Sequence, residues 1–346
     1  MVDKYLEEDI NNIINSNIPL DELANSTIFV TGATGLIGSL LIRTFIRMNK
    51  NIHIIALIRN EDKAKDIFED DYNKITFIVG DIRNEILFDE RVDFIYHCAS
   101  VTTSKTMVEY PVETLTTSVQ GTINVLELAK QKRVKSVVYV SSMEVYGTFM
   151  VANDNVTEDQ LGYIDPLRVR SNYPESKRLC ENICVAYLNE FNVPVKIARL
   201  AQTFGAGILK GENRVFAQFA RSAINKENII LHTDGLSEGN YCYTSDAIKA
   251  LLILLVRGEN GQAYNISNPD THTTIVDMAY MVCKKIANDE IKVIFDIPET
   301  NTFGYAAPTK MKLNSDKMQQ LGWKPEVCLK DAFIRLIGSI LNNNLC

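Results

Sequence analysis

A phenol and an ammonium lie four residues apart in this sequence, at Tyr173 and Lys177. This spacing places both side chains on one face of a helix. A tyrosine with its ordinary pKa of about 10 acts as a base near neutral pH only where nearby positive charge stabilises the phenolate. Ser142 follows the apolar run 136–140, so its hydroxyl could hydrogen-bond the same substrate oxygen. The three residues together predict proton transfer coupled to hydride transfer.

The segment 31–38, TGATGLIG, follows a short apolar run and opens an apolar stretch with helical character. Gly32 permits a tight turn, Gly35 lets the backbone approach a pyrophosphate, and Gly38 allows close packing of the helix on the strand. The N-terminus of the helix favours the anion. This context predicts a dinucleotide site whose contacts come from Gly32, Thr34, Gly35, Leu36, Ile37 and Gly38.

The residue that closes the second expected strand bears on the choice of cofactor. NAD-specific sites place a carboxylate there to bond the ribose 2′-hydroxyl, whereas this chain has Arg59. A guanidinium pairs well with a 2′-phosphate, so the sequence favours NADP(H), with NAD(H) as the alternative. Asp81 and Ile82, which follow the third expected strand, are expected at the adenine.

The elements that position these residues alternate between apolar strands and helices. Strands are expected over 27–30, 53–58, 75–79, 94–96, 136–140 and 195–199, and helices over 36–48, 61–68, 112–131 and 174–189. This alternation predicts an α/β fold, a doubly wound parallel sheet of the Rossmann type with a smaller C-terminal substrate-binding lobe. We expect a dinucleotide-binding domain over 1–200 that includes a lead-in helix within 1–25. The lobe is expected mainly over 201–346, with elements at about 226–265 returning to the first domain.

Composition narrows the class of protein. The 346 residues are 46% apolar and 23% charged with a net charge of −7, which argues against a nucleic-acid partner. No run approaches the ~18–20 apolar residues of a membrane span, and the N-terminus lacks the pattern of a signal peptide. The seven cysteines are scattered and the four histidines lack ligand spacing, so we expect reduced thiols, no metal and a cytoplasmic location.

Several segments resemble the extended short-chain dehydrogenase/reductase superfamily. They are TGATGLIG at 31–38, HCAS at 97–100, SSMEVYG at 141–147 and the pair Tyr173 and Lys177. RLAQTFG at 199–205, YCYTSD at 241–246, YNIS at 264–267 and LGW at 321–323 resemble its nucleotide-sugar branch of epimerases, 4,6-dehydratases and UDP-glucuronate decarboxylases. The likeness extends from about residue 26 to residue 340.

The resemblance implies that the partner is a nucleotide-diphosphate sugar, oxidised at C4 by a bound nicotinamide. Tyr173 would remove the proton of the 4-hydroxyl, Ser142 would hydrogen-bond that oxygen, and Lys177 would hold the cofactor ribose. Ala99 would also contact the cofactor. Ser142, Gln202, Arg214, Tyr241 and Lys310 are the substrate-binding residues that the resemblance implies.

Positions 143 and 144 bear on the outcome of the reaction. Glu144 matches the dehydratases and decarboxylases and could act as an acid-base group or hold a water; a surface glutamate is the alternative. Met143 has no exchangeable proton, unlike the aspartic acid of the dehydratases and the serine of the decarboxylases. Lys310 stands in the place of a carboxylate-binding arginine, without its bidentate fork.

Two further positions depart from the branch. Gly239 replaces an arginine that contacts the diphosphate, and Gln202 replaces a substrate asparagine. The sequence therefore favours an epimerase and a decarboxylase-like reaction about equally, and favours both over a 4,6-dehydratase. An NADPH-dependent 4-ketoreductase and a non-catalytic NADP-sensing protein are further alternatives.

Two observations remain open in the sequence. Arg168 and Arg170 precede Tyr173 and are either phosphate contacts or exposed side chains. The helices 112–131 and 174–189 form a dimer interface in many relatives, which makes a homodimer plausible here. The apolar residues that we assign to that surface are Leu115, Val119, Ile123, Leu126, Ile183 and Tyr187.

Overall fold

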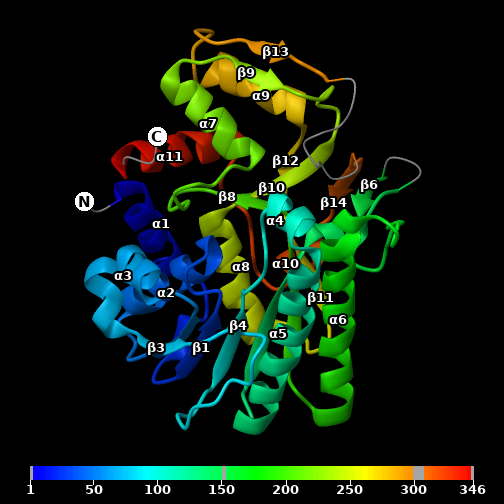
Figure 1. Ribbon diagram of the computed structural model, residues 1–346. Helices are drawn as coiled ribbons and strands as arrows, with labels where there is room; N and C mark the ends of the chain where they lie inside the picture. The colour runs from blue at the N-terminus through cyan, green and yellow to red at the C-terminus, as the bar shows by residue number, and fades with distance from the viewer. Residues whose placement is uncertain (1–2, 150–152, 299–307, 344–346) are drawn as a thin grey trace.

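A seven-stranded parallel sheet forms the centre of the computed structural model, which describes residues 3–149, 153–298 and 308–343 (Figure 1). Its strands are β1 (Thr27–Thr31), β2 (His53–Ile58), β3 (Thr76–Val79), β4 (Phe94–His97), β5 (Ser136–Ser142), β7 (Val195–Leu200) and β11 (Ala263–Ile266). The spatial order is β11-β7-β5-β4-β1-β2-β3, and every neighbouring pair is parallel. The order reverses between β1 and β4, where doubly wound folds bind their ligands. The predicted Rossmann-type fold is confirmed.

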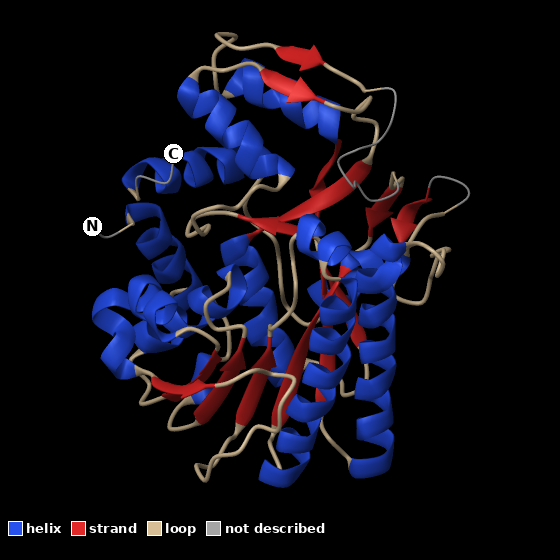
Figure 2. Cartoon of the chain, viewed as in Figure 1, coloured by secondary structure: helices blue, strands red, loops and turns tan. Residues whose placement is uncertain are grey.

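Helices cover both faces of this sheet, because the strands bury side chains on both sides (Figure 2). In β1, Ile28 and Val30 face one apolar cluster and Phe29 faces the other. The first face carries α1 (Lys4–Ile14), α2 (Leu36–Met48), α3 (Glu61–Phe68) and α8 (Thr244–Arg257). The second carries α5 (Pro111–Lys132) and α6 (Asn172–Phe191), with the short α4 (Ser104–Glu109) before them. Short 3-10 turns lie at Leu20–Leu23, Glu69–Lys74, Met143–Tyr146 and Val169–Ser171.

A smaller lobe sits over the carboxyl ends of the strands (Figure 1). It contains a three-stranded sheet in the order β12-β10-β8, formed by β8 (Gln202–Phe204), β10 (Glu238–Tyr243) and β12 (Asn268–Thr274). Two pairs of short parallel strands join it: β9 (Ile229–Leu231) with β13 (Val293–Phe295), and β6 (Asn153–Val156) with β14 (Met311–Leu313). Its helices are α7 (Val215–Asn225), α9 (Ile275–Lys285) and α11 (Leu329–Asn342), and the short α10 (Asp316–Gln319) lies near β11. Within 226–265, α8 and β11 lie on the central sheet, whereas β9 and β10 belong to the lobe.

The apolar residues that the sequence assigned to a subunit interface do not all lie at the surface. Leu126 is fully buried in the core between α5 and the sheet, so its assignment was wrong. Val119, Ile183 and Tyr187 are half-buried against the same core, whereas Leu115 is exposed. A helical apolar stripe alone does not distinguish the face toward a sheet from the face toward a partner.

No helix in the described ranges is long and apolar enough to cross a membrane.

Candidate active site

The turn between β1 and α2 leaves no room for side chains at its glycines. Gly32 has a φ of +67°, and a Cβ there would lie 2.7 Å from the backbone nitrogen of Ala99. Gly38 packs against the carbonyl oxygen of Gly32, which leaves no space for a Cβ at position 38. The helix begins at Leu36 without a side-chain cap on Gly35, so its first amides are free to bind an anion. These residues fit the pyrophosphate of a dinucleotide; Thr34 lies in the same turn and Ile37 in the first turn of α2.

The strand ends next to this turn hold the residues expected at the cofactor's adenosine. Arg59 follows β2 and is exposed, within electrostatic range of Asp81. The carboxylate of Asp81 accepts two hydrogen bonds from the guanidinium of Arg83, at 2.6 and 2.9 Å, and this contact lowers the pKa of Asp81. Ile82 is buried, and its carbonyl accepts a hydrogen bond from the amide of Asn124 at 2.8 Å.

The structure brings Tyr173, Lys177 and Ser142 together where β5 ends beside α6. Tyr173 lies in the first turn of α6 and is buried, and the Ser142 side chain is close enough to lower the pKa of its phenol. The Lys177 Nζ is 5.8 Å from the centroid of the Tyr173 ring and donates a hydrogen bond of 2.8 Å to the carbonyl of Val140. Helical spacing and the end of a buried strand therefore assemble the predicted triad.

Burial raises the pKa of Tyr173 to about 12, and the negative charge of Glu144 adds to this shift. The nearby Ser142 side chain and the charges of Arg170 and Arg214 lower the pKa of Tyr173, but by less than burial raises it. The phenol is therefore protonated at neutral pH in the protein alone. A base function requires the further positive charge that a bound, oxidised nicotinamide supplies.

Arg170 is a residue of this site whose role the sequence left open. Its Nη2 donates a hydrogen bond of 3.0 Å to Glu144, and its guanidinium lies 5.9 Å from the centroid of the Tyr173 ring. The Nε of Arg170 is buried and has no hydrogen-bond partner among the described residues. Arg168 is exposed and pairs with Asp165 instead. The 3-10 turn before α6 directs Arg170 toward Tyr173 and leaves Arg168 exposed to solvent.

The lobe brings several expected substrate residues to the same region. Gln202 on β8 lies opposite Tyr241 on β10, and Tyr241 is buried. Arg214 precedes α7 and pairs with Glu212 through hydrogen bonds of 2.7 and 3.0 Å. Its positive charge lowers the pKa of Tyr173. Lys310 is exposed beside β14 and forms no hydrogen bond or ion pair with these residues in the described part of the chain.

Two departures from the family pattern prove to be neighbours in space. Met143 is buried in a small apolar cluster with Val156 and Met311. Gly239 is also buried, and a Cβ there would lie 3.7 Å from the Cε of Met143. Met143 therefore lies in contact distance of the position where a side chain at 239 would begin.

A buried polar network supports the strand that carries Ser142. The hydroxyl of Ser141 donates a hydrogen bond of 2.6 Å to Glu181 on α6, which also accepts three from Arg199 on β7, at 2.7, 3.0 and 3.2 Å. Arg199 donates a further bond of 3.0 Å to the hydroxyl of Tyr146. Removing either Glu181 or Arg199 would leave a buried charge unpaired, and the Ser141–Glu181 bond connects β5 to α6. Sequence spacing gave no signal for it.

His97 has a structural role. It is buried, and its ring nitrogens are hydrogen-bonded to the hydroxyls of Thr31 and Thr122, at 2.8 and 3.1 Å. Burial and the charge of Lys177 lower the pKa of His97 to about 3, so the ring is neutral. Across the described ranges, no group of three or more His, Cys, Asp or Glu residues is arranged to hold a metal ion.

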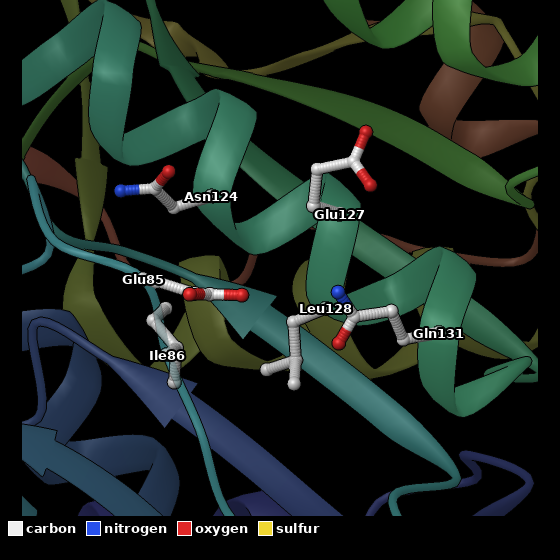
Figure 3. A pocket seen from close by; sticks show the side chains of 6 residues that line it. All are labelled: Glu85, Ile86, Asn124, Glu127, Leu128 and Gln131. Atoms are coloured by element: carbon white, nitrogen blue, oxygen red, sulfur yellow. The ribbon is translucent and has the colours of Figure 1, made fainter.

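A hollow of about 260 Å³ lies along α5 and the segment after β3 (Figure 3). Its lining residues are Glu85, Ile86, Asn124, Glu127, Leu128 and Gln131. The amide of Asn124 already bonds two backbone carbonyls, and Glu127 accepts a hydrogen bond from Tyr187. The hollow includes none of the expected site residues, and nothing in it indicates a ligand.

Comparisons with known proteins define the class to which this fold and site belong. The family model of the NAD dependent epimerase/dehydratase family matches residues 28–267, and the chain belongs to this family. The resemblance to the extended short-chain dehydrogenase/reductase superfamily is confirmed. UDP-glucuronic acid decarboxylase 6 of Arabidopsis thaliana is 32% identical over 313 residues, which cover 89% of this chain and 87% of that protein.

Solved structures show the same fold at lower identity. An epimerase of Methanothermobacter thermautotrophicus superposes with a TM-score of 0.79 at 21% identity, covering 98% of this chain and 96% of that one. The UDP-glucuronic acid 4-epimerase of Bacillus cereus, solved with UDP-glucuronic acid and NAD, gives a TM-score of 0.76 at 22% identity, covering 92% and 99%.

Proposed function

We propose that this protein modifies a nucleotide-diphosphate sugar through a 4-keto intermediate, with a nucleotide-linked uronic acid as substrate and decarboxylation as outcome. The observation that carries the proposal is the grouping of Tyr173, Ser142 and Lys177 where β5 meets α6, in a fold that also carries the glycine turn between β1 and α2. The UDP-glucuronic acid decarboxylases among its relatives, similar over most of their length, support the choice of outcome. The glutamate at 144 supports it as well. In this proposal, the segment 201–346 supplies most of the substrate contacts.

The residues of the site have distinct tasks in this reaction. Tyr173 takes the proton of the sugar 4-hydroxyl, Ser142 hydrogen-bonds the same oxygen, and the charge of Lys177 stabilises the phenolate. A nicotinamide cofactor held at the glycine turn would supply the hydride acceptor for C4 and the hydride for its re-reduction. The ketone makes the C5 carboxylate a β-keto acid, which loses carbon dioxide and leaves its electron pair in an enolate. In this proposal Glu144, which accepts a hydrogen bond from Arg170 and raises the pKa of Tyr173 by its charge, holds the water or proton that protonates C5.

Incubating the purified protein with UDP-glucuronic acid tests this proposal. We expect a UDP-linked pentose and carbon dioxide in equal amounts by NMR, without net consumption of cofactor. A panel of UDP-, dTDP-, CDP- and GDP-sugars identifies the nucleotide. Absence of any decarboxylated, epimerised or 4-keto product across the panel would contradict the proposal, and stoichiometric consumption of NADPH would favour the ketoreductase alternative.

Epimerisation at C4 is the second candidate, and one observation favours it. Lys310, which stands in place of the carboxylate-binding arginine of the decarboxylases, is exposed. A site that holds the carboxylate less firmly returns the hydride to the other face of C4 before carbon dioxide is lost. The same NMR experiment distinguishes the two outcomes, because an epimer keeps its C6 carboxylate.

We also propose that NADP(H) is the preferred cofactor, because Arg59 stands where NAD-specific sites place a carboxylate. It is exposed at the end of β2, where a 2′-phosphate would meet it. A cytoplasmic location agrees with the free state of the six described cysteines.

A homodimer through α5 and α6 is part of the proposal. Val112 and Leu115 on α5 and Leu179 and Val185 on α6 are exposed. Such apolar side chains on two adjacent helices are covered when a second copy packs against them. Light scattering should give about twice the 39.0 kDa of the chain, and Leu179→Glu should halve the measured mass. A monomeric wild type at micromolar concentration would refute the dimer.

A further inference from the structure

The N-terminal helix α1 lies between the two parts of the molecule (Figure 1). Ile10 and Ile13 are fully buried in the apolar cluster that α2 and α8 form on the central sheet. Another face of α1 lies against α11, and the ring of Tyr5 packs directly on Gly338, where no Cβ would fit. The helix is thus built into both the dinucleotide-binding part and the lobe.

A buried carboxylate on α1 reaches the lobe through a tyrosine. The hydroxyl of Tyr243, at the end of β10, donates a hydrogen bond of 2.6 Å to Asp9. Arg335 of α11 also contacts Asp9, with its Nη2 at 2.7 Å from the carboxylate. The same Tyr243 oxygen accepts a hydrogen bond of 3.2 Å from the backbone amide of Ala206. Asp9 therefore orients the hydroxyl that holds the chain just after β8.

A second path connects α1 to the next residue of that loop. Asp3, which caps α1, accepts a hydrogen bond from the hydroxyl of Ser339, and this hydroxyl accepts one of 3.0 Å from the amide of Gly207. The side chain of Leu6 lies 3.1 Å from where a Cβ of Gly207 would stand. Gly207 has a φ of +81°, so glycine suits both its backbone and its crowded surroundings.

The loop that α1 holds connects two residues expected to contact substrate. It begins at Gly205, after the strand β8 that carries Gln202, and ends at Arg214, which precedes α7. We propose that α1 is a positioning element, called the strap from here on. Through the hydrogen bonds of Asp9, Tyr243 and Ser339 it holds residues 205–208 of this loop in place, and it thereby positions the substrate side of the site. The strap acts on the binding of the nucleotide diphosphate and leaves the cofactor site on the central sheet unaffected. Only the identity of this ligand rests on the proposed function.

Three variants test the strap against one control. Tyr243→Phe removes the hydroxyl shared by Asp9 and Ala206, Asp9→Asn removes the charge, and Ser339→Ala breaks the second path with the smallest change. Glu7→Gln is the matched control, because Glu7 lies on the same helix but pairs with Arg47 of α2, at 3.2 Å. Hydrogen exchange of segments 28–58 and 205–214, calorimetric titration with UDP, and cofactor affinity are measured for each.

For the three strap variants we expect faster exchange in 205–214, unchanged exchange in 28–58, and UDP affinity lowered about tenfold, as for one lost buried hydrogen bond. Cofactor affinity should stay within twofold, and Glu7→Gln should resemble the wild type. Unchanged exchange in 205–214, or equal loss in both segments and both affinities, would overturn the strap. If UDP does not bind the wild type, the proposed substrate fails, and the exchange data still decide on the strap.

Discussion

Tyr173→Phe is expected to lower turnover of the nucleotide sugar by at least about 10³-fold, the usual size of a lost general base in this chemistry. The phenylalanine ring fills the same buried space beside Lys177, so the fold and the cofactor site should stay intact. The substitution removes the phenolic oxygen, which in the proposed reaction accepts the substrate proton. Steady-state kinetics together with cofactor affinity measure the two effects separately.

Tyr163→Phe provides the control, because Tyr163 is exposed and lies outside the site. Since burial raises the pKa of Tyr173 to about 12, activity of the wild type should rise with pH through the range where the cofactor-bound phenol loses its proton. The rise should vanish in Tyr173→Phe. Turnover that persists in this variant would remove Tyr173 from its role.

The second large effect is expected at Arg59, the residue that follows β2. The wild type should bind NADP(H) more tightly than NAD(H), and Arg59→Asp should reverse the preference by about 10²-fold or more. A guanidinium and a phosphate form charge-assisted hydrogen bonds of about 1.5–3 kcal/mol, and the aspartate adds repulsion for the phosphate and a partner for the free ribose. Titrating both cofactors against both proteins measures the change.

Arg91→Asp makes the same change of charge at an exposed position. Arg91 pairs with Asp93 at the amino ends of the strands, whereas Arg59 lies at their carboxyl ends. It should leave the cofactor preference unaltered. Equal affinity of the wild type for both cofactors, or the same preference in Arg59→Asp, would show that Arg59 does not select the cofactor.

The parts of the site that were predictable from the sequence are those that local spacing decides. The glycine turn lies within eight residues, and Tyr173 and Lys177 lie within one helical turn, so a strand-turn-helix and a helix suffice to place them. The alternation of apolar strands and helices likewise determined the sheet. Local patterns and a small set of topological rules carry this information.

The rest depends on pairings between distant parts of the chain. Glu181 meets Ser141 across 40 residues, and Arg170 meets Glu144 across 26, with nothing in either segment to indicate the partner. The short strands of the lobe, such as β9 and β13, have only three residues each and take their register from each other. Such strands are too short for a period of two to be recognised.

In the proposed reaction, hydride leaves C4 of the sugar and returns to it within one active site. Incubation with UDP-glucuronic acid deuterated at C4 tests this directly. We expect a UDP-pentose that retains deuterium at C4, formed more slowly than from unlabelled substrate. A product that has lost the deuterium to solvent, or no reaction in protein shown to bind both cofactor and UDP-glucuronic acid, would contradict the claim.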